Sequence, residues 1–530
     1  MAWNEQRARG RIERLLGSVP ASAIGVRDLE AFLQERIRFR DAALASGARF
    51  DEPVFAVSRN QAVTTHGAHV YANLMDFNDH QTERGAETEA SHRRSMQFLH
   101  AHYAACDQLI AAFGIQRVDF HGPRLHAVVL TPTGDASEAT RIETAVAFAH
   151  AFRQMVDRMT RRYGASLQTR VRVGIDSGAA VAINSGRRGE HEPLFIGSPA
   201  NHAAEQAEGD EEGVFLARRA QVALQTAPGR PWGTALRLDE ATVLARAPAT
   251  DGRAASAGQR VDEAFAALER QQSAVTAALD DPRRASFDFH HRAPPLRTID
   301  YADHTPSNAI RMPLVSLFAD IAGYTAYVDD AIATGMVGQA VANLHVMRGE
   351  MNHVARDDFG GRKVRYVGDC LHAILAEGDA RSTDAAASVR TGVLAAAGIH
   401  SSIELCRAML PGASRLGIAV GLELGQTPIA RLGLRGEASV RCASSRATCL
   451  SEESQSGCAA GQVAIGEAAL AAADAHVRRL FDVPGRRIRN PGHAAALTVL
   501  AGASAAIPAA AAAAPHVLRP APQEMRAYGR

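Results

Sequence analysis

Two parts of the chain repeat one another at a nearly constant separation. The stretch HVYANLMDFND (69–79) aligns with SLFADIAGYTA (316–326), and VDFHGPRLHAVV (118–129) aligns with VRYVGDCLHAIL (364–375). The separation is 247 positions from Asn73 to Asp320 and 246 from Gly122 to Gly368. A third match, VRVGIDSG on GIAVGLELG, pairs Gly174 with Gly421, again 247 positions apart. Three matches at one offset indicate a duplication, so we expect the chain to build the same domain twice.

The repeat divides the 530 residues into five segments. We expect the two copies at 61–249 and 311–501. Residues 1–60 carry helical patterns and are expected to pack on the domain that follows. Residues 250–310 are interpreted as a helix and a linker that crosses the surface. The Ala/Pro-rich end, 502–530, is expected to be loosely ordered.

The composition is that of an ordinary globular protein, with 46% hydrophobic and 22% charged residues. The net charge of +1 argues against nucleic acid or an anionic membrane as an obligatory partner. The first residues, MAWNEQRARGRIERLL, lack the apolar core of a signal peptide, and no apolar run is long enough to span a bilayer. The six cysteines include no C-x-x-C pair, which suits a reducing compartment. We therefore expect a cytoplasmic protein without membrane insertion.

The stretch Leu314–Asp330, LVSLFADIAGYTAYVDD, predicts a buried strand that ends at Asp320 before Gly323 and a helix. In the later match, Gly368 predicts a tight turn that carries Asp369 between two further strands. A single Asp at a strand end is usually a turn former or a helix cap. Two carboxylates on adjacent strand ends, however, could hold a divalent metal ion between them.

The pattern F-x-D-I-x-G-[FY]-T, followed by V-G-D with a strand on each side, resembles the class III nucleotidyl cyclases from Met312 onward. The resemblance implies an α+β fold with two tandem ferredoxin-like domains. Each would have a mixed, mostly antiparallel sheet with helices on one face. The two domains would form an intramolecular pseudo-heterodimer, with the active site between them.

The resemblance also implies roles for residues of the second copy. Asp320 and Asp369 match the two metal-binding carboxylates, and Ile321 matches a residue whose backbone oxygen is a further ligand. Two ions of Mn²⁺ or Mg²⁺ suit this all-oxygen set. Arg435 matches a catalytic arginine that binds phosphate through its planar fork, and Phe318 is expected to contact the nucleotide.

The first copy departs from the metal-binding pattern, because Asn73 and Pro123 stand at the carboxylate positions and cannot hold the metals. It nevertheless keeps Asn201 at the family's ribose-orienting asparagine, within GSPANHAAEQAE. Extending the alignment without a gap places Ala447 and Ser451 of the second copy at the asparagine and transition-state arginine positions. The first copy has Glu205 at that arginine position. One composite site per chain is therefore expected, with a degenerate second site.

Asp119 falls at the base-reading position of the composite site, while Arg365 is expected to face the degenerate site. Neither residue matches the purine-specific patterns of the family. A chain with these features resembles the uridylate and cytidylate cyclases of Pycsar antiphage systems. The implied function is conversion of UTP to cyclic UMP, which acts on a separate effector protein. The alternatives are a cytidylate cyclase, an adenylate cyclase or an inactive nucleotide-binding sensor.

Overall fold

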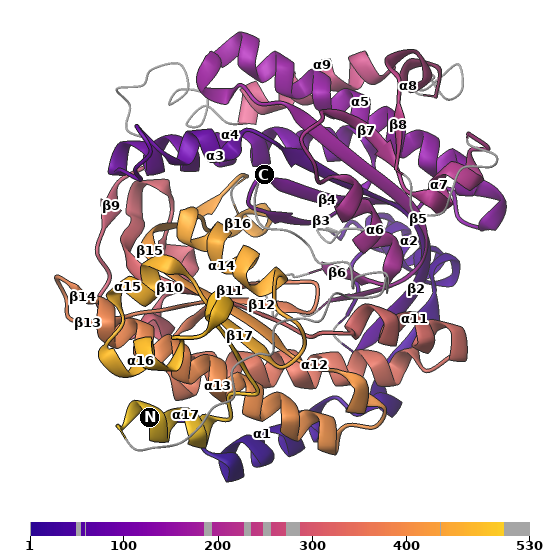
Figure 1. Cartoon of the computed structure of the whole chain (residues 1–530). Coiled ribbons are helices and arrows are strands. Elements are labelled where there is room, and N and C mark those ends of the chain that lie inside the picture. The colour runs from indigo at the N-terminus through magenta and orange to yellow at the C-terminus, as the bar shows by residue number, and fades with distance from the viewer. Residues whose placement is uncertain are drawn as a thin grey trace.

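The protein is described by a computed structural model that covers residues 2–48, 55–58, 60–184, 193–226, 235–246, 256–271, 287–434 and 436–502. The predicted phosphate-binding Arg435 lies outside the described residues, and so does the predicted tail apart from Gly502. Two halves with the same architecture lie against each other, the first violet and the second orange to yellow in Figure 1. This confirms the duplication and the predicted fold class.

Within the described residues, the first half forms a sheet of eight strands in the order β3-β4-β2-β5-β7-β8, with β1 on β2 and β6 on β5. The strands are β1 (Gly25–Asp28), β2 (Gln61–Leu74), β3 (Gln116–His121), β4 (Arg124–Val129), β5 (Val171–Asn184), β6 (Pro193–Ile196), β7 (Gly213–Leu216) and β8 (Leu236–Leu238). Among the strands described in this half, only the pairs β1–β2 and β5–β7 are parallel.

The second half repeats this order as β11-β12-β10-β15-β17-β18, with β9 on β10 and β16 on β15. Its strands in that sheet are β9 (Phe289–His290), β10 (Ala309–Asp320), β11 (Arg362–Val367), β12 (Cys370–Leu375), β15 (Ala419–Leu432), β16 (Val440–Ala443), β17 (Gln462–Ile465) and β18 (Arg487–Arg489). Its two parallel pairs, β9–β10 and β15–β17, are the counterparts of those in the first half. Every strand of one sheet therefore has an equivalent in the other.

Long helices cover one face of each sheet. They are α4 (Glu89–Phe113), α5 (Glu138–Tyr163) and, packed on both, α9 (Ala257–Gln271) in the first half, with α12 (Val337–His353) and α13 (Ala385–Met409) in the second. Two shorter helices, α6 (Ser198–Gln206) and α14 (Arg446–Ser456), pack on the opposite faces. The expectation of helices on one face alone was therefore too simple. None of the described helices is long and apolar enough to cross a membrane.

The side chains of strand β10 alternate between the two faces of the second sheet. Val315, Leu317 and Ala319 lie in the core beneath α12 and α13, because alternate residues of a strand point to the same side. Ser316, Phe318 and Asp320 point to the other side, where the Ser451 hydroxyl of α14 donates a hydrogen bond to the Ser316 hydroxyl at 2.9 Å. The alternation predicted from the sequence therefore places Asp320 on the face of the sheet that meets the first half.

Helix α1 (Glu5–Ser18) packs on α12 and α13 of the second half, so the prediction that the N-terminal segment packs on the domain that follows is wrong for this helix. Arg11 is buried there between two carboxylates. Its guanidinium donates to Glu350 at 2.6 and 2.9 Å and to Asp358 at 3.0 and 3.1 Å. Buried charges need such partners, and Glu350 and Asp358 supply them for Arg11 at the place where the helix packs.

The predicted linker is also more than a surface crossing. Its first part is helix α9, and residues 272–286 lie outside the described residues. Beyond them β9 joins the second sheet, and Leu296, Ile299 and Tyr301 are buried against β10. The linker therefore contributes to the core of the second half.

Candidate active site

Two carboxylates meet at the end of β10. Asp320 is the last residue of that strand, and Asp369 follows Gly368 in the turn from β11 to β12. Gly368 has φ of +59°, a conformation that glycine adopts without strain. Since β12 pairs with β10 through Ala319 and Leu371, the turn lies beside Asp320, and the backbone N–H of Ile321 donates to the Asp369 carboxylate. The predicted pair is therefore brought together.

The electrostatics of this pair favour a bound cation. Burial raises the pKa of Asp320 to about 6. Burial and the neighbouring charge of Asp320 hold the pKa of Asp369 well above its usual range. Carboxylate oxygens and a main-chain carbonyl, that of Ile321, are the donors that Mg²⁺ and Mn²⁺ prefer. Within the described part of the chain no three His, Cys, Asp or Glu side chains converge on a metal position, so two carboxylates are the acidic ligands available.

The first half supplies the opposite wall through α6. The Asn201 side-chain amide donates to the Thr325 hydroxyl at 2.6 Å, and the Ser198 backbone N–H donates to Asp329 at 3.1 Å. Thr325 and Asp329 belong to α11 (Tyr324–Thr334), which begins four residues after Asp320. Asn201 therefore reaches from one half to the carboxylate end of the other, as a composite site requires.

Next to Asn201, His202 is the basic group of this wall. Its Nδ1 lies 2.8 Å from the buried Asp176 carboxylate. That hydrogen bond raises the pKa of His202, with smaller contributions from the charges of Glu205 and Asp329. Because Glu205 brings a negative charge to the position where the family has an arginine, His202 is the nearest described side chain on α6 that can carry a positive one.

Asp119 and Arg365 meet each other across the two halves. Arg365 Nη1 lies 3.3 and 3.5 Å from the two Asp119 oxygens. The Arg365 side chain is almost buried, whereas that of Asp119 is 37% exposed. The expectation that Arg365 faces a separate, degenerate site is therefore wrong, because the two base-reading positions form one pair of a carboxylate and a guanidinium.

The contacts of two equivalent glycines correct the predicted register of α14. A side chain at Gly174 would collide with the Ala203 carbonyl and the Ala207 nitrogen, while one at Gly421 would collide with the Ser451 carbonyl and the Gln455 nitrogen. Ala203 thus corresponds to Ser451, two positions away from the ungapped alignment. The second half therefore has Cys449 where the first has Asn201, and Glu453 where the first has Glu205.

Phe318 lies under the site, with 1% of its surface exposed. Its ring stacks on His372 at 4.3 Å, as Tyr71 stacks on His126 at 4.2 Å in the first half. Burial lowers the pKa of both histidines well below the usual value. Both histidines therefore pack against an aromatic ring inside the protein. The structure gives the Phe318 side chain a packing position, and its contact with a nucleotide stays a prediction.

Sequence reasoning missed a buried contact between the halves. His121 Nε2 lies 3.0 Å from the Glu452 carboxylate, and both side chains are buried. His121 and Asp119 point the same way from β3, because they are two residues apart in a strand. The pair could not be found from spacing, since its partners lie 331 residues apart. Thr325, by contrast, was visible as the last residue of the quoted cyclase pattern.

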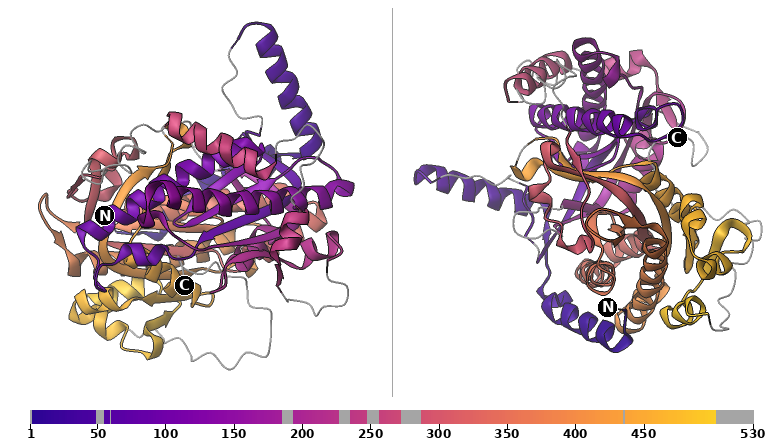
Figure 2. Two further views of the ribbon diagram at one scale, coloured as in Figure 1. Left: turned by 90° about the horizontal axis from the view of Figure 1, so that it is seen from above. Right: turned by 90° about the vertical axis from the view of Figure 1, so that its left-hand side faces the viewer.

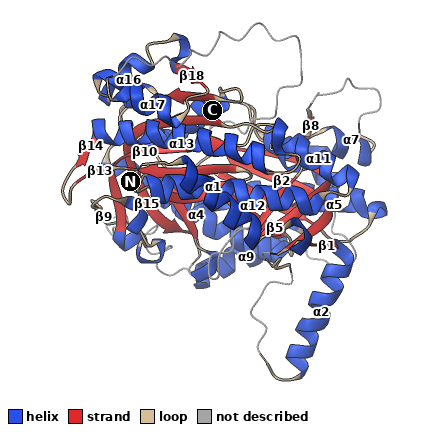
Figure 3. Ribbon diagram, turned by 90° about the horizontal axis from the view of Figure 1, so that it is seen from below, coloured by secondary structure: helices blue, strands red, loops and turns tan. Residues whose placement is uncertain are grey.

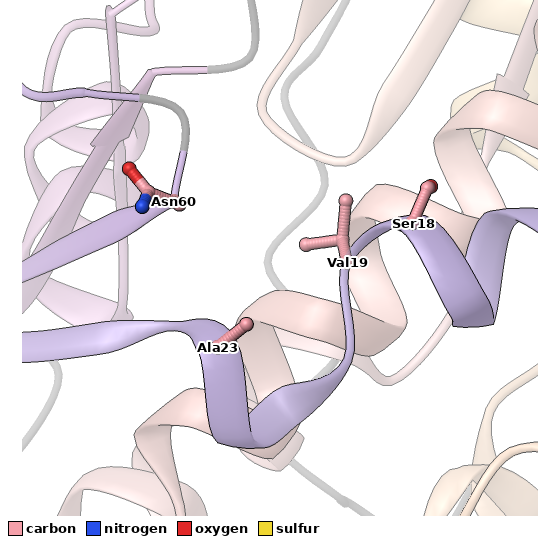
Figure 4. Close-up of a pocket in the computed structure, with 4 residues that line it drawn as sticks. All are labelled: Ser18, Val19, Ala23 and Asn60. Carbon is pink, nitrogen blue, oxygen red and sulfur yellow. The ribbon is translucent and has the colours of Figure 1, made fainter.

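A pocket elsewhere in the molecule is less suited to a nucleotide than this site. It is lined by Ser18, Val19, Ala23 and Asn60, between the end of α1 and the start of β2 (Figure 4). None of these side chains carries a charge, so the lining does not suit a triphosphate.

Comparison with known proteins agrees with the geometry. The chain is 44% identical over 492 residues to the uridylate cyclase of a Rhizobium species, covering 91% of this chain and 92% of that one. It is 33% identical over 488 residues to the uridylate cyclase of Pseudomonas aeruginosa, covering 91% and 88%. The crystal structure of a class III adenylyl cyclase-like ATP-binding protein from Pseudomonas aeruginosa superposes with a TM-score of 0.81 at 31% identity, over 94% and 99% of the two chains.

A scan against protein-family models matches none of them. The two curated relatives nevertheless extend over nine-tenths of the chain, and the solved structure covers a still larger share. Matches of this extent take in both halves that form the composite site. On this evidence the chain belongs to the uridylate cyclases, a tandem-domain group within the class III nucleotidyl cyclases.

Proposed function

We propose that this enzyme converts UTP to 3′,5′-cyclic UMP and pyrophosphate. The observation that supports the proposal is that Asn201 of the first half bonds Thr325, in the helix that follows Asp320, and that Asp119 of the first half pairs with Arg365, on the strand that leads to Asp369. The names of the relatives point to the uridylate reaction. The reaction joins the ribose 3′-oxygen to the α-phosphorus, releases the 3′-hydroxyl proton and breaks the bond to pyrophosphate.

Asp320, Asp369 and the Ile321 carbonyl would hold two ions of Mn²⁺ or Mg²⁺. When bound, these ions lower the pKa of the 3′-hydroxyl and neutralise phosphate charge. The start of α11 adds backbone N–H groups, which favour anionic phosphate. Arg435 is proposed to pair with the leaving phosphates, and Asn201 to orient the ribose. His202 is proposed to supply the positive charge that Glu205 does not.

Base selection is assigned to the Asp119–Arg365 pair. A carboxylate only accepts hydrogen bonds and a guanidinium only donates them, so the pair suits a base edge with a donor beside an acceptor. Uracil presents N3–H next to O4 and meets this requirement. Cytosine and adenine each carry an amino group next to a ring nitrogen, so the pair alone does not separate the three bases.

The test is to incubate the purified chain with each of the four nucleoside triphosphates and Mn²⁺ and to identify the cyclic product by mass spectrometry. Cyclic UMP as the main product supports the proposal. Cyclic AMP as the main product would instead support an adenylate cyclase, in line with the ATP-binding structural relative. Nucleotide binding without any product would indicate a sensor. The Asp320→Asn variant, prepared in the same way, controls for contaminating cyclases.

The resemblance to Pycsar cyclases leads us to propose a cytoplasmic role in defence against phage. Cyclic UMP would activate a separate effector protein that harms the infected cell. Cells that carry both proteins are expected to resist phage, and cells with Asp320→Asn and the same effector are expected to be sensitive. Plaque counts measure the difference, and equal resistance in both strains would contradict a role for the cyclase product.

A further inference from the structure

The strand registers line up four residues across one face of each sheet. In the first half this row is Gly174 of β5, Tyr71 of β2, His126 of β4 and Asp119 of β3. In the second half it is Gly421 of β15, Phe318 of β10, His372 of β12 and Arg365 of β11. Side chains of directly paired residues lie on the same face of a sheet. Because Asp119 and Arg365 contact each other, the two rows meet across the interface.

Both rows lie on the faces that the halves turn toward each other. Figure 2 shows the long helices of the first half (violet) and those of the second half (orange) on opposite outer sides of the molecule, with strands between them. Figure 3 shows α12 and α13 in front of the strands (red). Phe318 lies on the face opposite to these two helices, and Tyr71 packs on α6 at the corresponding face of the first sheet.

Tyr71 differs from its counterpart Phe318 by one hydroxyl group. Both rings stack on the histidine of their row, with centroids 4.2 Å apart for Tyr71 and 4.3 Å apart for Phe318. Tyr71 keeps 9% of its surface exposed, whereas Phe318 keeps 1%. Among the described residues none forms a hydrogen bond with the Tyr71 hydroxyl. The packing of this ring therefore does not depend on the hydroxyl, which is left for a ligand.

The position of Tyr71 falls between the two parts of the first half that are assigned to the nucleoside. On one side its ring packs against the alanines of α6, the helix that carries Asn201. On the other side it stacks on His126, which pairs with Asp119 in the sheet. The ribose is assigned to Asn201 and the base to Asp119, so Tyr71 lies where the two parts of the nucleoside join.

The Tyr71 hydroxyl can act as a hydrogen-bond donor at physiological pH. Burial, followed by the charge of Asp119, raises the pKa of Tyr71, and the smaller effect of Arg124 opposes this. The phenol therefore keeps its proton, and a protonated phenol donates one hydrogen bond. Across the interface the order of groups is then donor, acceptor, donor, for Tyr71, Asp119 and Arg365.

We propose that the Tyr71 hydroxyl donates a hydrogen bond to the 2-carbonyl oxygen of uracil and thereby selects UTP over CTP. The inference rests on the proposed function, because it takes the composite site as the nucleotide site. The edge of uracil presents O2, N3–H and O4, which are acceptor, donor and acceptor, and O2 is the group nearest the ribose. This order complements Tyr71, Asp119 and Arg365.

Cytosine does not fit the same three groups. With its O2 held by Tyr71, it would bring N3, an acceptor, to the Asp119 carboxylate and its 4-amino group, a donor, to the Arg365 guanidinium. Without Tyr71 the base could shift along the pair until the amino group faced Asp119. Tyr71 therefore separates two bases that the Asp119–Arg365 pair alone does not separate.

The test compares kcat/KM of the natural full chain and of Tyr71→Phe for UTP, 2-thio-UTP and CTP. Sulfur at position 2 is a weak acceptor, so the natural chain should prefer UTP over 2-thio-UTP by the worth of one neutral hydrogen bond, roughly 2- to 13-fold. Tyr71→Phe should lose this preference and should use CTP more readily relative to UTP. The variant should fold, because Phe318 shows that phenylalanine makes the same stack.

Two controls make the result specific to one atom. The preference for UTP over 4-thio-UTP should be equal in both proteins, since O4 is assigned to Arg365. Tyr327→Phe removes a hydroxyl that accepts a hydrogen bond from Asn343, and it should keep the natural preference for UTP over 2-thio-UTP.

Two outcomes would count against the inference in different ways. If cyclic UMP forms and Tyr71→Phe keeps the full preference for UTP over 2-thio-UTP, the role of Tyr71 is overturned and the proposed function stands. If the natural chain forms no cyclic UMP from UTP, the proposed function fails and the assignment of Tyr71 fails with it.

Discussion

The two halves of the molecule share one strand order and differ at the ends of the same two strands. The second half has Asp320 and Asp369 there, with raised pKa values. The first half has Asn73 and Pro123, followed by Arg124, which is buried and lies 3.5 Å from Glu208. The second half thus keeps two carboxylates whose charge a bound cation would neutralise. The first half has the positive side chain of Arg124 at the equivalent place.

This difference shows how a duplicated fold can divide one reaction between its copies. In the proposed reaction, metal binding uses the ends of β10 and β12, and orientation of the substrate uses a helix on the face of the other sheet. The first half has lost the carboxylates and kept Asn201. The second half has Cys449 at that helical position and has kept the carboxylates. Under the proposed function neither half is sufficient alone, and the two together make one site.

The sharpest test of the comparison is to remove the negative pair. Asp320→Asn and Asp369→Asn should each reduce product formation to background, because either change removes a metal ligand without changing side-chain size. Circular dichroism should show an intact fold. Measurable Mn²⁺-dependent activity near the wild-type rate in either variant would show that the first half supplies the metal site.

The raised pKa of Asp320 should appear in the pH dependence of stability of the metal-free protein. The folded state holds this proton up to pH of about 6, whereas the unfolded chain releases it near the ordinary value of 3.8. The folded state therefore loses stability as the pH rises from about 4 to 6, by about 3 kcal/mol for this group. Asp320→Asn should lack this loss, and urea titrations of both proteins across the range measure it. Equal pH profiles of stability for the two proteins would contradict a raised pKa of Asp320 in the folded state.

A smaller effect is expected at the Asp119–Arg365 pair. Asp119→Ala removes a charged hydrogen-bond acceptor. Loss of such a hydrogen bond weakens binding by about 1.5–3 kcal/mol, or roughly 10- to 150-fold. We expect a higher KM for UTP or weaker selection among the four triphosphates, with Mn²⁺ affinity unchanged. Arg365→Ala should have a comparable effect because the two side chains meet. Asp107→Asn, at a carboxylate that binds Arg117 instead, serves as the control. Unchanged selectivity in both variants would remove the pair from base reading.

The least effect is expected when carboxylates are returned to the first half. The double variant Asn73→Asp, Pro123→Asp should bind no second nucleotide, because Arg124 still occupies that end of the sheet and α14 still has Cys449. Equilibrium dialysis with a non-cyclisable UTP analogue counts the bound nucleotides. Two bound nucleotides per chain would mean that the missing carboxylates alone account for the functional difference between the halves.

The sequence was sufficient to predict features that depend on local pattern. The alternation in β10, the Gly368 turn and the repeat offset together placed Asp320 beside Asp369. Contacts between the halves were not predictable in this way, since no spacing relates Asp119 to Arg365 or His121 to Glu452. The register of α14 was missed by two residues, and the helix contact at Gly421 reveals the shift.

The buried position of Arg11 has a consequence for how the protein is made. Its partners, Glu350 and Asp358, follow more than three hundred residues later. At about 5–20 residues per second, α1 leaves the ribosome roughly twenty seconds to a minute before they exist. The first half must therefore be synthesised while this helix has no binding surface. The first helix to emerge can dock only after the second half has been made, so a chain that stops early keeps its amino end unattached.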